Sequence, residues 1–222
     1  NSGTQGFRAT ATFTTARTFN LNAATVGIDV ASGATLTLSS PFTFSVATNA
    51  LQKNDLGKLV ISANNSTRSG TTTIAGGILE ISNANALGSG TIVVTSVAQG
   101  GSALWLTNGI TLTNAIQQTV TANGQVGGID GTGGIFSASG NNTINGAITN
   151  SGGFNQTYGA ASGATLNFGA SALTTVANSP FFNAAGTGVI NIAGFSNNTS
   201  AFTKVGTGTL NITGTFSNTA TP

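Results

Sequence analysis

Three of the four acidic residues in this 222-residue chain are almost evenly spaced. Asp29, Asp55 and Glu80 follow one another at intervals of about 25 residues, close to one coil of a β-solenoid. In a chain that coils with a similar period, stacking brings such carboxylates together, and a carboxylate pair is what glycoside hydrolysis requires. However, Asp55 takes the place of a corner glycine and Glu80 is the outward residue of a strand, as is typical of solvated charges. The chain also has no histidine, and no basic residues cluster beside the acids. We therefore expect no catalytic residue.

Two glycine-rich phrases resemble ligand-binding loops. The stretch from Gly127 to Gly134 contains Asp130 and resembles a calcium-binding repeat, but such repeats place Asp in successive turns, and one aspartate cannot supply six oxygen ligands. Gly186-Thr187-Gly188 is not followed by the Gly-Lys-Thr or the helix of a phosphate-binding loop. Cysteine is absent, which excludes thiolate metal sites, cysteine nucleophiles and disulfides. We predict no metal site, no cofactor-binding residue and no cofactor.

Threonine pairs and a single tryptophan are the remaining candidates for binding. Aligned on one flat face, threonine pairs can order water and bind ice, although threonine is also a good neutral residue for outward strand positions. Trp105 alternates with Leu104 and Leu106. It is therefore predicted to face outward, where it lies beneath a loop or contacts a partner. The pairs are Thr10/Thr12, Thr35/Thr37, Thr71/Thr73, Thr111/Thr113 and Thr119/Thr121.

The composition narrows the class of protein further. Hydrophobic residues make up 39% of the chain and charged residues only 5%, which is too apolar and too weakly charged for a disordered protein. The net charge of +2 comes from scattered residues and provides no basic stripe for nucleic acid. No apolar run approaches the roughly 18 residues of a membrane helix. The chain begins at Asn1, which suggests a processed product or a piece of a longer protein.

The strongest pattern is a phrase that occurs twice. Gly186-Thr187-Gly188-Val189-Ile190-Asn191-Ile192-Ala193-Gly194 returns further along the chain as Gly206-Thr207-Gly208-Thr209-Leu210-Asn211-Ile212-Thr213-Gly214. The resulting period, near 20, is typical of a solenoid with one coil of β-structure per repeat. Short segments that read apolar, variable, apolar predict strands with one buried face. These segments are 36–38, 59–61, 79–81, 92–94, 104–106, 110–112, 166–168, 190–192 and 210–212.

Two all-β architectures fit such strands, a sandwich of antiparallel hairpins and a parallel β-helix. A sandwich requires no fixed offset between similar phrases, whereas a β-helix requires similar phrases one coil apart. The offset between the two copies of the phrase favours the β-helix, and Leu166-Asn167-Phe168 precedes Ile190-Asn191-Ile192 by a similar interval. We predict roughly ten coils of about 20 to 24 residues. Columns of Leu, Ile, Val and Phe form the core, asparagine and threonine stack in hydrogen-bonded ladders, and glycines occupy the corners.

Parts of the chain resemble a known repeat. Residues 51–61, 69–79 and Ala86-Leu87-Gly88 follow the order Leu-x-Lys-x-Gly-x-Gly-x-Leu-x-Leu, then Gly-x-Thr-x-Ile-x-x-Gly-x-Leu, then Ala-Leu-Gly. A second start runs from Phe202 to Ile212. Asn54-Asp55-Leu56 departs from this pattern because it lacks the first glycine. The pattern resembles the passenger-associated transport repeat of bacterial autotransporters.

The resemblance implies a right-handed parallel β-helix that is exported and displayed outside a bacterial cell. We therefore expect residues 1–222 to form one β-helical domain, either a segment of a longer rod or a fibre subunit. The predicted function is that of an exported, non-enzymatic structural protein, a cell-surface stalk, adhesin or extracellular filament. The expected partners are the same rod, through continuation or end-to-end association, and host or surface glycans. The alternatives are a carbohydrate-binding or carbohydrate-cleaving β-helix and an ice-binding solenoid.

Overall fold

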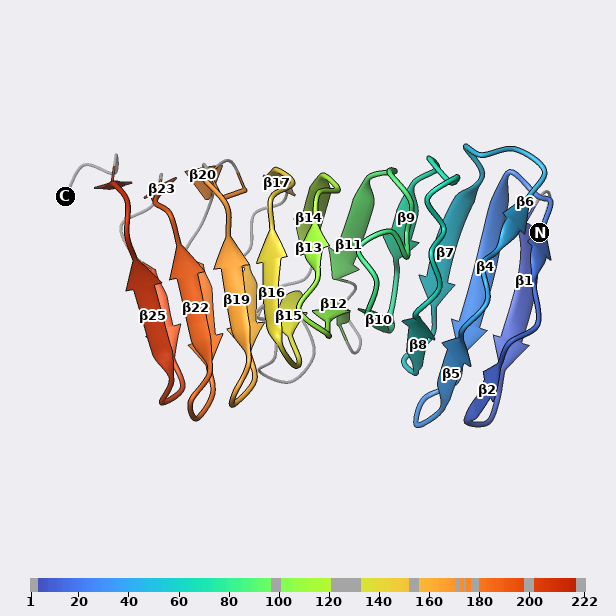
Figure 1. The fold of residues 1–222 in the computed structure, drawn as a ribbon, viewed down its shortest axis with the longest axis horizontal. Coiled ribbons are helices and arrows are strands. Elements are labelled where there is room, and N and C mark those ends of the chain that lie inside the picture. The colour runs from blue at the N-terminus through green and yellow to red at the C-terminus, as the bar shows by residue number, and fades with distance from the viewer. Residues whose placement is uncertain are drawn as a thin grey trace.

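The computed structural model shows an all-β chain wound into a parallel β-solenoid, as predicted. It describes residues 4–96, 101–120, 133–151, 156–170, 172–173, 175–176, 180–197 and 202–218. Strands stack side by side along the long axis, and the two termini lie at opposite ends of the stack (Figure 1). Every strand pair is parallel, which excludes the antiparallel sandwich.

The strands follow in chain order: β1 (Thr4–Ala9), β2 (Phe13–Thr15), β3 (Asn20–Leu21), β4 (Thr25–Val30), β5 (Thr35–Leu38), β6 (Thr43–Phe44), β7 (Ala50–Asn54), β8 (Lys58–Ile61), β9 (Thr72–Ile74), β10 (Gly77–Ile81), β11 (Ile92–Ser96), β12 (Ser102–Leu106), β13 (Thr111–Leu112), β14 (Ile116–Val120), β15 (Ile135–Ser137), β16 (Asn141–Ile144), β17 (Ile148–Ser151), β18 (Thr157–Ala160), β19 (Thr165–Phe168), β20 (Thr175–Val176), β21 (Phe181–Ala184), β22 (Val189–Ile192), β23 (Phe195–Asn197), β24 (Thr203–Val205), β25 (Thr209–Ile212) and β26 (Phe216–Asn218). The segments predicted as strands all fall on these elements, except that β13 begins one residue after Ile110.

The strands form three faces, which the chain visits in turn. The first face holds the seven-stranded sheet β1-β4-β7-β9-β11-β14-β17 and then the three-stranded sheet β20-β23-β26. The second face is the nine-stranded sheet β2-β5-β8-β10-β12-β15-β18-β21-β24. The third face holds the pair β3-β6 and, later in the chain, the sheet β13-β16-β19-β22-β25. Between β8 and β9, and between β10 and β11, turns replace the strand of the third face.

The coil length varies more than the sequence indicates. The repeated phrase stacks as predicted, since Asn191 pairs with Asn211 and Asn167 with Asn191. The interval from Leu104 to its register partner Ile135 is longer than both of these asparagine-to-asparagine intervals. The structure has fewer coils than the roughly ten predicted, since the second face, which is one unbroken sheet, has nine strands. The error arises because a uniform coil length ignores such insertions.

The core consists of inward side chains stacked in columns. On the second face each inward residue lies on its counterpart one turn away. These residues are fully buried, so each adds apolar area to one continuous core. The column on this face contains Leu36, Leu59, Leu79, Leu104, Ile135, Tyr158 and Phe182, each 0% exposed.

Candidate functional site

The three evenly spaced acids do not converge on one site. Asp29 lies on β4, on the first face, and its Oδ1 accepts a hydrogen bond of 2.8 Å from the Asn54 amide. Asp55 follows β7 and pairs with Arg8 at 3.4 Å. Glu80 lies on β10, on the second face. Each acid has its own partner, which is Lys58 in the case of Glu80. The three carboxylates do not stack on one another, because the acids occupy different faces and corners.

A small cluster of polar and aromatic side chains lies on the outer side of the second face. Lys58 Nζ contacts Glu80 Oε2 at 3.0 Å and lies 5.1 Å from the centre of the Trp105 ring. Trp105 is the register neighbour of both Glu80 and Phe136, and its ring lies 5.2 Å from that of Phe136. Trp105 faces outward as predicted, since Leu104 and Leu106 on either side are buried. We name Lys58, Glu80, Trp105 and Phe136 the Trp105 platform.

The most buried charge is a lysine inside a corner of the coil. Lys53 occupies an inward position on β7, between Ile28 and Ile74 of the adjacent turns, and is 0% exposed. Its Nζ donates to the carbonyl oxygens of Asn54, Asp55 and Gly76 at 2.6, 2.7 and 3.0 Å. The ammonium thus uses all three of its N–H donors. Two bond within its own corner, and one bonds to the next turn along the chain. Burial lowers the pKa of Lys53 to about 8, although nearby Asp55 and Asp29 act in the opposite direction.

The second copy of the motif forms the same corner at the C-terminal end. Lys204 Nζ donates to Gly206 O at 2.5 Å, two residues further along the chain, as Lys53 does to Asp55. The two corners lie on different faces, since Lys53 belongs to the first face and Lys204, the register neighbour of Phe182, to the second. Lys204 is only partly buried, because no described turn covers it. In both copies the motif lysine therefore bonds to a carbonyl oxygen of its own corner.

The glycines of the motif have separate geometric roles. The position of the first motif glycine has a left-handed backbone in both copies, with φ of 59° at Asp55 and 75° at Gly206. The second position has no room for a side chain, since a Cβ on Gly57 would lie 2.2 Å from Ala31 O and one on Gly208 2.3 Å from Gly188 O. The corner role predicted for glycine is confirmed here. Asp55 adopts the conformation that the missing first glycine normally supplies.

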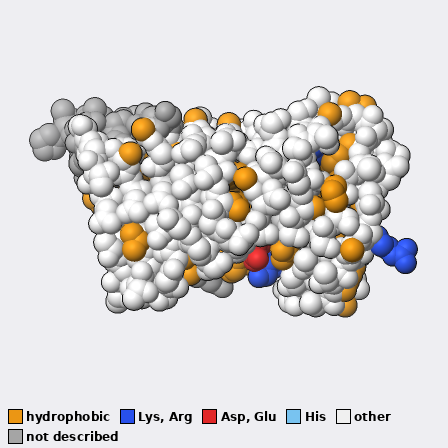
Figure 2. All heavy atoms as spheres, in the orientation of Figure 1, with side chains coloured by type: hydrophobic (Ala, Val, Ile, Leu, Met, Phe, Trp, Pro, Cys, Tyr) orange, Lys and Arg blue, Asp and Glu red, His pale blue; other side chains and the backbone are white. Residues whose placement is uncertain are grey.

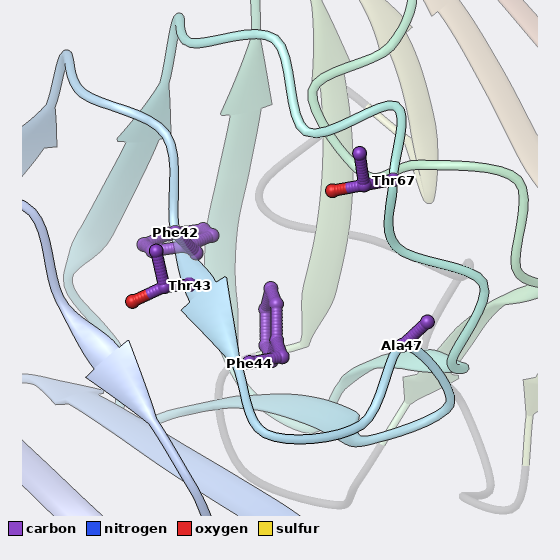
Figure 3. Close-up of a pocket in the computed structure, with 5 residues that line it drawn as sticks. All are labelled: Phe42, Thr43, Phe44, Ala47 and Thr67. Carbon is purple, nitrogen blue, oxygen red and sulfur yellow. The ribbon is translucent and has the colours of Figure 1, made fainter.

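A second buried cation lies near a pocket on the third face. Arg68 is 1% exposed and its guanidinium lies 5.5 Å from the centre of the Phe44 ring. Its Nη1 donates to Thr72 Oγ1 and Leu87 O at 2.8 and 2.9 Å, and burial lowers the pKa of Arg68 to about 10. The pocket beside it has a volume of about 240 Å³. It is lined by Phe42, Thr43, Phe44, Ala47 and Thr67, which come from β6 and the neighbouring loops (Figure 3).

This pocket has little chemistry to offer. Its lining consists of apolar side chains and two threonines. Arg68 is committed to Thr72 and to main-chain oxygens within the coil, and it is not among the lining residues. We therefore assign the pocket no ligand and Arg68 a structural role.

An asparagine ladder runs along the outer side of the third face. Asn191 Nδ2 donates to Asn167 Oδ1 and Asn211 Nδ2 donates to Asn191 Oδ1, both at 2.8 Å. Asn167 in turn donates to Asn141 Oδ1 at 2.5 Å. Each amide thus donates toward the N-terminal end and accepts from the C-terminal side. The ladder of identical side chains that the sequence predicts is confirmed.

The remaining candidates that lie among the described residues do not form sites. The threonine pairs are divided among the faces, for example Thr35/Thr37 on the second and Thr71/Thr73 on the first, so they do not share the flat face that ice binding requires. Gly186-Thr187-Gly188 forms the corner before β22. Residues 127–132, with Asp130, and Thr121 lie outside the described residues. Within the described part of the chain, no group of three or more Asp and Glu residues is placed to hold a metal ion.

The visible surface carries few charges, and Figure 2 shows Lys, Arg, Asp and Glu atoms at only a few places on one face. Among the described residues there is no helix with the length and hydropathy needed to span a bilayer. No protein-family model matches the chain. No curated protein and no solved structure matches it significantly.

Proposed function

We propose that this chain is an exported, non-enzymatic structural rod that forms a stalk or fibre at a bacterial surface. The proposal rests on one observation: buried and ladder-forming polar side chains spend their hydrogen bonds on the coil itself. Lys53, Arg68 and the asparagine ladder all bond one turn of the coil to itself or to the next. Side chains used in this way maintain a stack and are not available for a reaction. The resemblance of residues 51–61 and 202–212 to the transport repeat supports export and surface display.

The test for a structural role measures resistance and display together. The chain is fused to an outer-membrane translocator with an epitope at its N-terminus, and surface exposure of the epitope is measured by antibody binding on intact cells. We expect display, and we expect the displayed rod to resist protease, because its backbone is hydrogen-bonded from turn to turn. A matched variant, Leu79→Asp, places a charge in the core column and is expected to lose both properties. An epitope that remains inside the cell with the native chain would contradict the proposal of export.

A second candidate function, glycan binding, is favoured by the Trp105 platform. Aromatic rings beside a carboxylate and an ammonium are the groups that hold sugars in binding sites. The glutamate and the two rings are register neighbours on β10, β12 and β15, so acid and aromatic groups do meet on one face. The charges of Lys58 and Glu80 already pair with each other, which explains the platform without a ligand and makes glycan binding the second choice.

The only tryptophan of the chain makes this candidate easy to test. Trp105 emission is recorded during titration with a panel of soluble oligosaccharides, and the same mixtures are analysed for cleavage products. A structural rod gives no saturable change and no products. A saturable shift that disappears in Glu80→Gln would establish glycan binding, and new reducing ends would establish an enzyme.

A further inference from the structure

The corner between β12 and β13 is an Asn-Gly turn on the surface of the coil. Asn108 and Gly109 are both exposed, and both have a left-handed backbone, with φ of 67° at each. Positive φ at two successive residues is typical of a type I′ turn, for which Asn-Gly is a preferred pair. Because Gly109 has no Cβ, its backbone nitrogen is poorly shielded from the amide side chain of Asn108.

Both ends of this turn are hydrogen-bonded, whereas the peptide in its middle is not. Thr107 N donates to the preceding coil at 3.0 Å, and Ile110 N donates to Asn142 Oδ1 of the following coil at 2.9 Å. Among the described residues, none bonds to the Asn108 carbonyl oxygen or to the Gly109 N–H. The central peptide can therefore rotate while β12 and β13 stay in register.

The surroundings of the central peptide leave room for this rotation. The following coil carries Gly140 beside it, and a Cβ on Gly140 would lie 2.7 Å from Gly109 N. Gly140 has no side chain, so that space stays open. Apart from its chain neighbours, a Cβ on Gly109 itself would meet no atom closer than Asn141 O at 3.6 Å.

Rotation of the central peptide brings a nucleophile to the Asn108 side chain. It converts a type I′ turn into a type II′ turn, and ψ of the first central residue changes from about +30° to about −120°. At that ψ the Gly109 nitrogen lies on the same side as the Asn108 Cβ, where it can close a five-membered ring with Cγ. Glycine at the second central position accepts the matching change of φ. Asparagine populates the rotated form only sparsely, so a reaction through it is slow and its product accumulates with time.

We propose that Asn108 is a site of spontaneous deamidation, in which its amide becomes a carboxylate through a cyclic imide. The Gly109 nitrogen loses its proton to solvent and attacks Cγ of Asn108. The Cγ–Nδ2 bond breaks, and Nδ2 leaves with a solvent proton as ammonia. Water then adds to either carbonyl of the imide and yields aspartate or isoaspartate, so the net reaction consumes one water and releases one ammonia. This modification goes beyond the proposed structural role and does not depend on it.

A second Asn-Gly pair in the same chain is held in the opposite way. Asn145 N and Gly146 N both donate to Leu112 O, at 2.8 and 3.4 Å. Gly146 is buried, and a Cβ there would lie 1.8 Å from Asn114 O. The Asn145–Gly146 peptide is therefore packed against the preceding coil and cannot rotate without local unfolding. This pair is the internal control for the proposal.

Deamidation changes both the charge and the geometry of the corner. The Asn108 amide donates to Ser82 O at 3.4 Å in the preceding coil, and a carboxylate cannot donate this bond. Isoaspartate also adds one methylene to the main chain between β12 and β13. One added carboxylate lowers the formal net charge from +2 to +1, so aged molecules separate from new ones by charge.

Peptide mapping of the aged full chain tests the proposal. The folded chain is incubated in mildly alkaline buffer and digested with chymotrypsin at intervals, which places the three Asn-Gly pairs on separate peptides. Mass spectrometry measures conversion at Asn108 and Asn145, and chromatography separates aspartate from isoaspartate. We expect Asn108 to convert roughly tenfold or more faster than Asn145, because only the latter requires local unfolding. The pair Asn123-Gly124 lies outside the described residues and does not enter the comparison.

The same incubation in guanidinium chloride separates structure from sequence. We expect Asn108 and Asn145 to convert at similar rates in the unfolded chain, since protection by the coil is lost. The variant Gly109→Ala, with an unchanged circular dichroism spectrum, is expected to convert at least severalfold more slowly at Asn108, because its Cβ hinders the attacking nitrogen. The control Thr107→Ala, in the same corner, keeps the native rate. Equal conversion of Asn108 and Asn145 in the folded chain, a native rate in Gly109→Ala, or a product without isoaspartate would each overturn the proposal.

Discussion

At the scale of single residues, the buried lysine of the corner is the most unusual group. Sequence alternation indicates its inward position, because Lys53 is two residues from inward Leu51, yet a lysine at such a position is usually taken as exposed. The partners that make burial tolerable are carbonyl oxygens of a corner and of the next turn. They depend on the winding of the chain, so the sequence alone did not reveal them.

Lys53 makes the stability of the rod depend on pH. Its pKa is lowered to about 8 by burial, while in the unfolded chain it is about 10.4. Between these values the unfolded chain binds more protons, so the free energy of unfolding rises with pH. We expect a rise of about 1–2 kcal/mol from pH 8 to pH 9.5, measured by urea denaturation. The variant Lys53→Met is expected to abolish the rise. The control Lys204→Met changes the equivalent, partly buried lysine of the second motif copy and is expected to keep the rise. An equal rise with pH in the native chain and both variants would contradict the assignment of the pH dependence to Lys53.

Replacing Asp55 by glycine restores the first glycine of the motif and tests the role of its left-handed backbone. Asp55 has a left-handed backbone, with φ of 59°, and its pair with Arg8 is exposed. Asp55→Gly is therefore expected to stabilise the fold by about 0.5–1 kcal/mol, since exposed ion pairs contribute little. Gly57→Ala serves as the contrast. Its Cβ would lie 2.2 Å from Ala31 O, and we expect it to destabilise by about 2 kcal/mol or more. Thermal unfolding measures both, and a destabilised Asp55→Gly would show that the carboxylate matters more than the backbone.

At the scale of the strand, the asparagine ladder contributes hydrogen bonds that repeat from turn to turn. Asn191 both donates to Asn167 and accepts from Asn211. We expect Asn191→Ala to lower the free energy of unfolding by about 1–2 kcal/mol, because two hydrogen bonds are lost. Asn211→Ala removes one bond at an exposed end and is expected to cost about half as much. Equal costs in denaturant unfolding would show that the loss does not depend on the number of ladder bonds removed and would contradict this account.

The strands themselves were predictable because each carries its own signal. The phrase Leu-Asn-Ile, with apolar residues on both sides of an asparagine, indicates strand, orientation and register at once, and β22 and β25 pair as it indicates. The turns that replace strands on the third face carry no such periodicity. Arg68 lies in one of them, so neither its burial nor the adjacent pocket followed from the pattern.

At the scale of the whole molecule, stability comes from contacts between neighbouring turns. Local phrases therefore predicted the architecture. The number of turns was overestimated, because it depends on insertions such as the one between β12 and β15. The same property explains why the three acids failed to converge. An interval near one coil does not bring residues together when turns differ in length, and Asp29 lies opposite Asn54 rather than Asp55.

We predict that this solenoid tolerates the removal of one complete turn. Thr165 pairs with Val189, so deletion of residues 165–188 places β22 on β16 with Asn191 in the position of Asn167. We expect a folded rod whose free energy of unfolding falls by about 1–4 kcal/mol, because stability scales with the number of residues. The denaturant slope should fall as well, since less surface is exposed on unfolding. Deletion of residues 165–176, half a turn, shifts inward columns onto other faces and is the control, expected to lose cooperative unfolding. Circular dichroism and urea titration distinguish the two, and loss of structure in the full-turn deletion would show that the turns are not interchangeable.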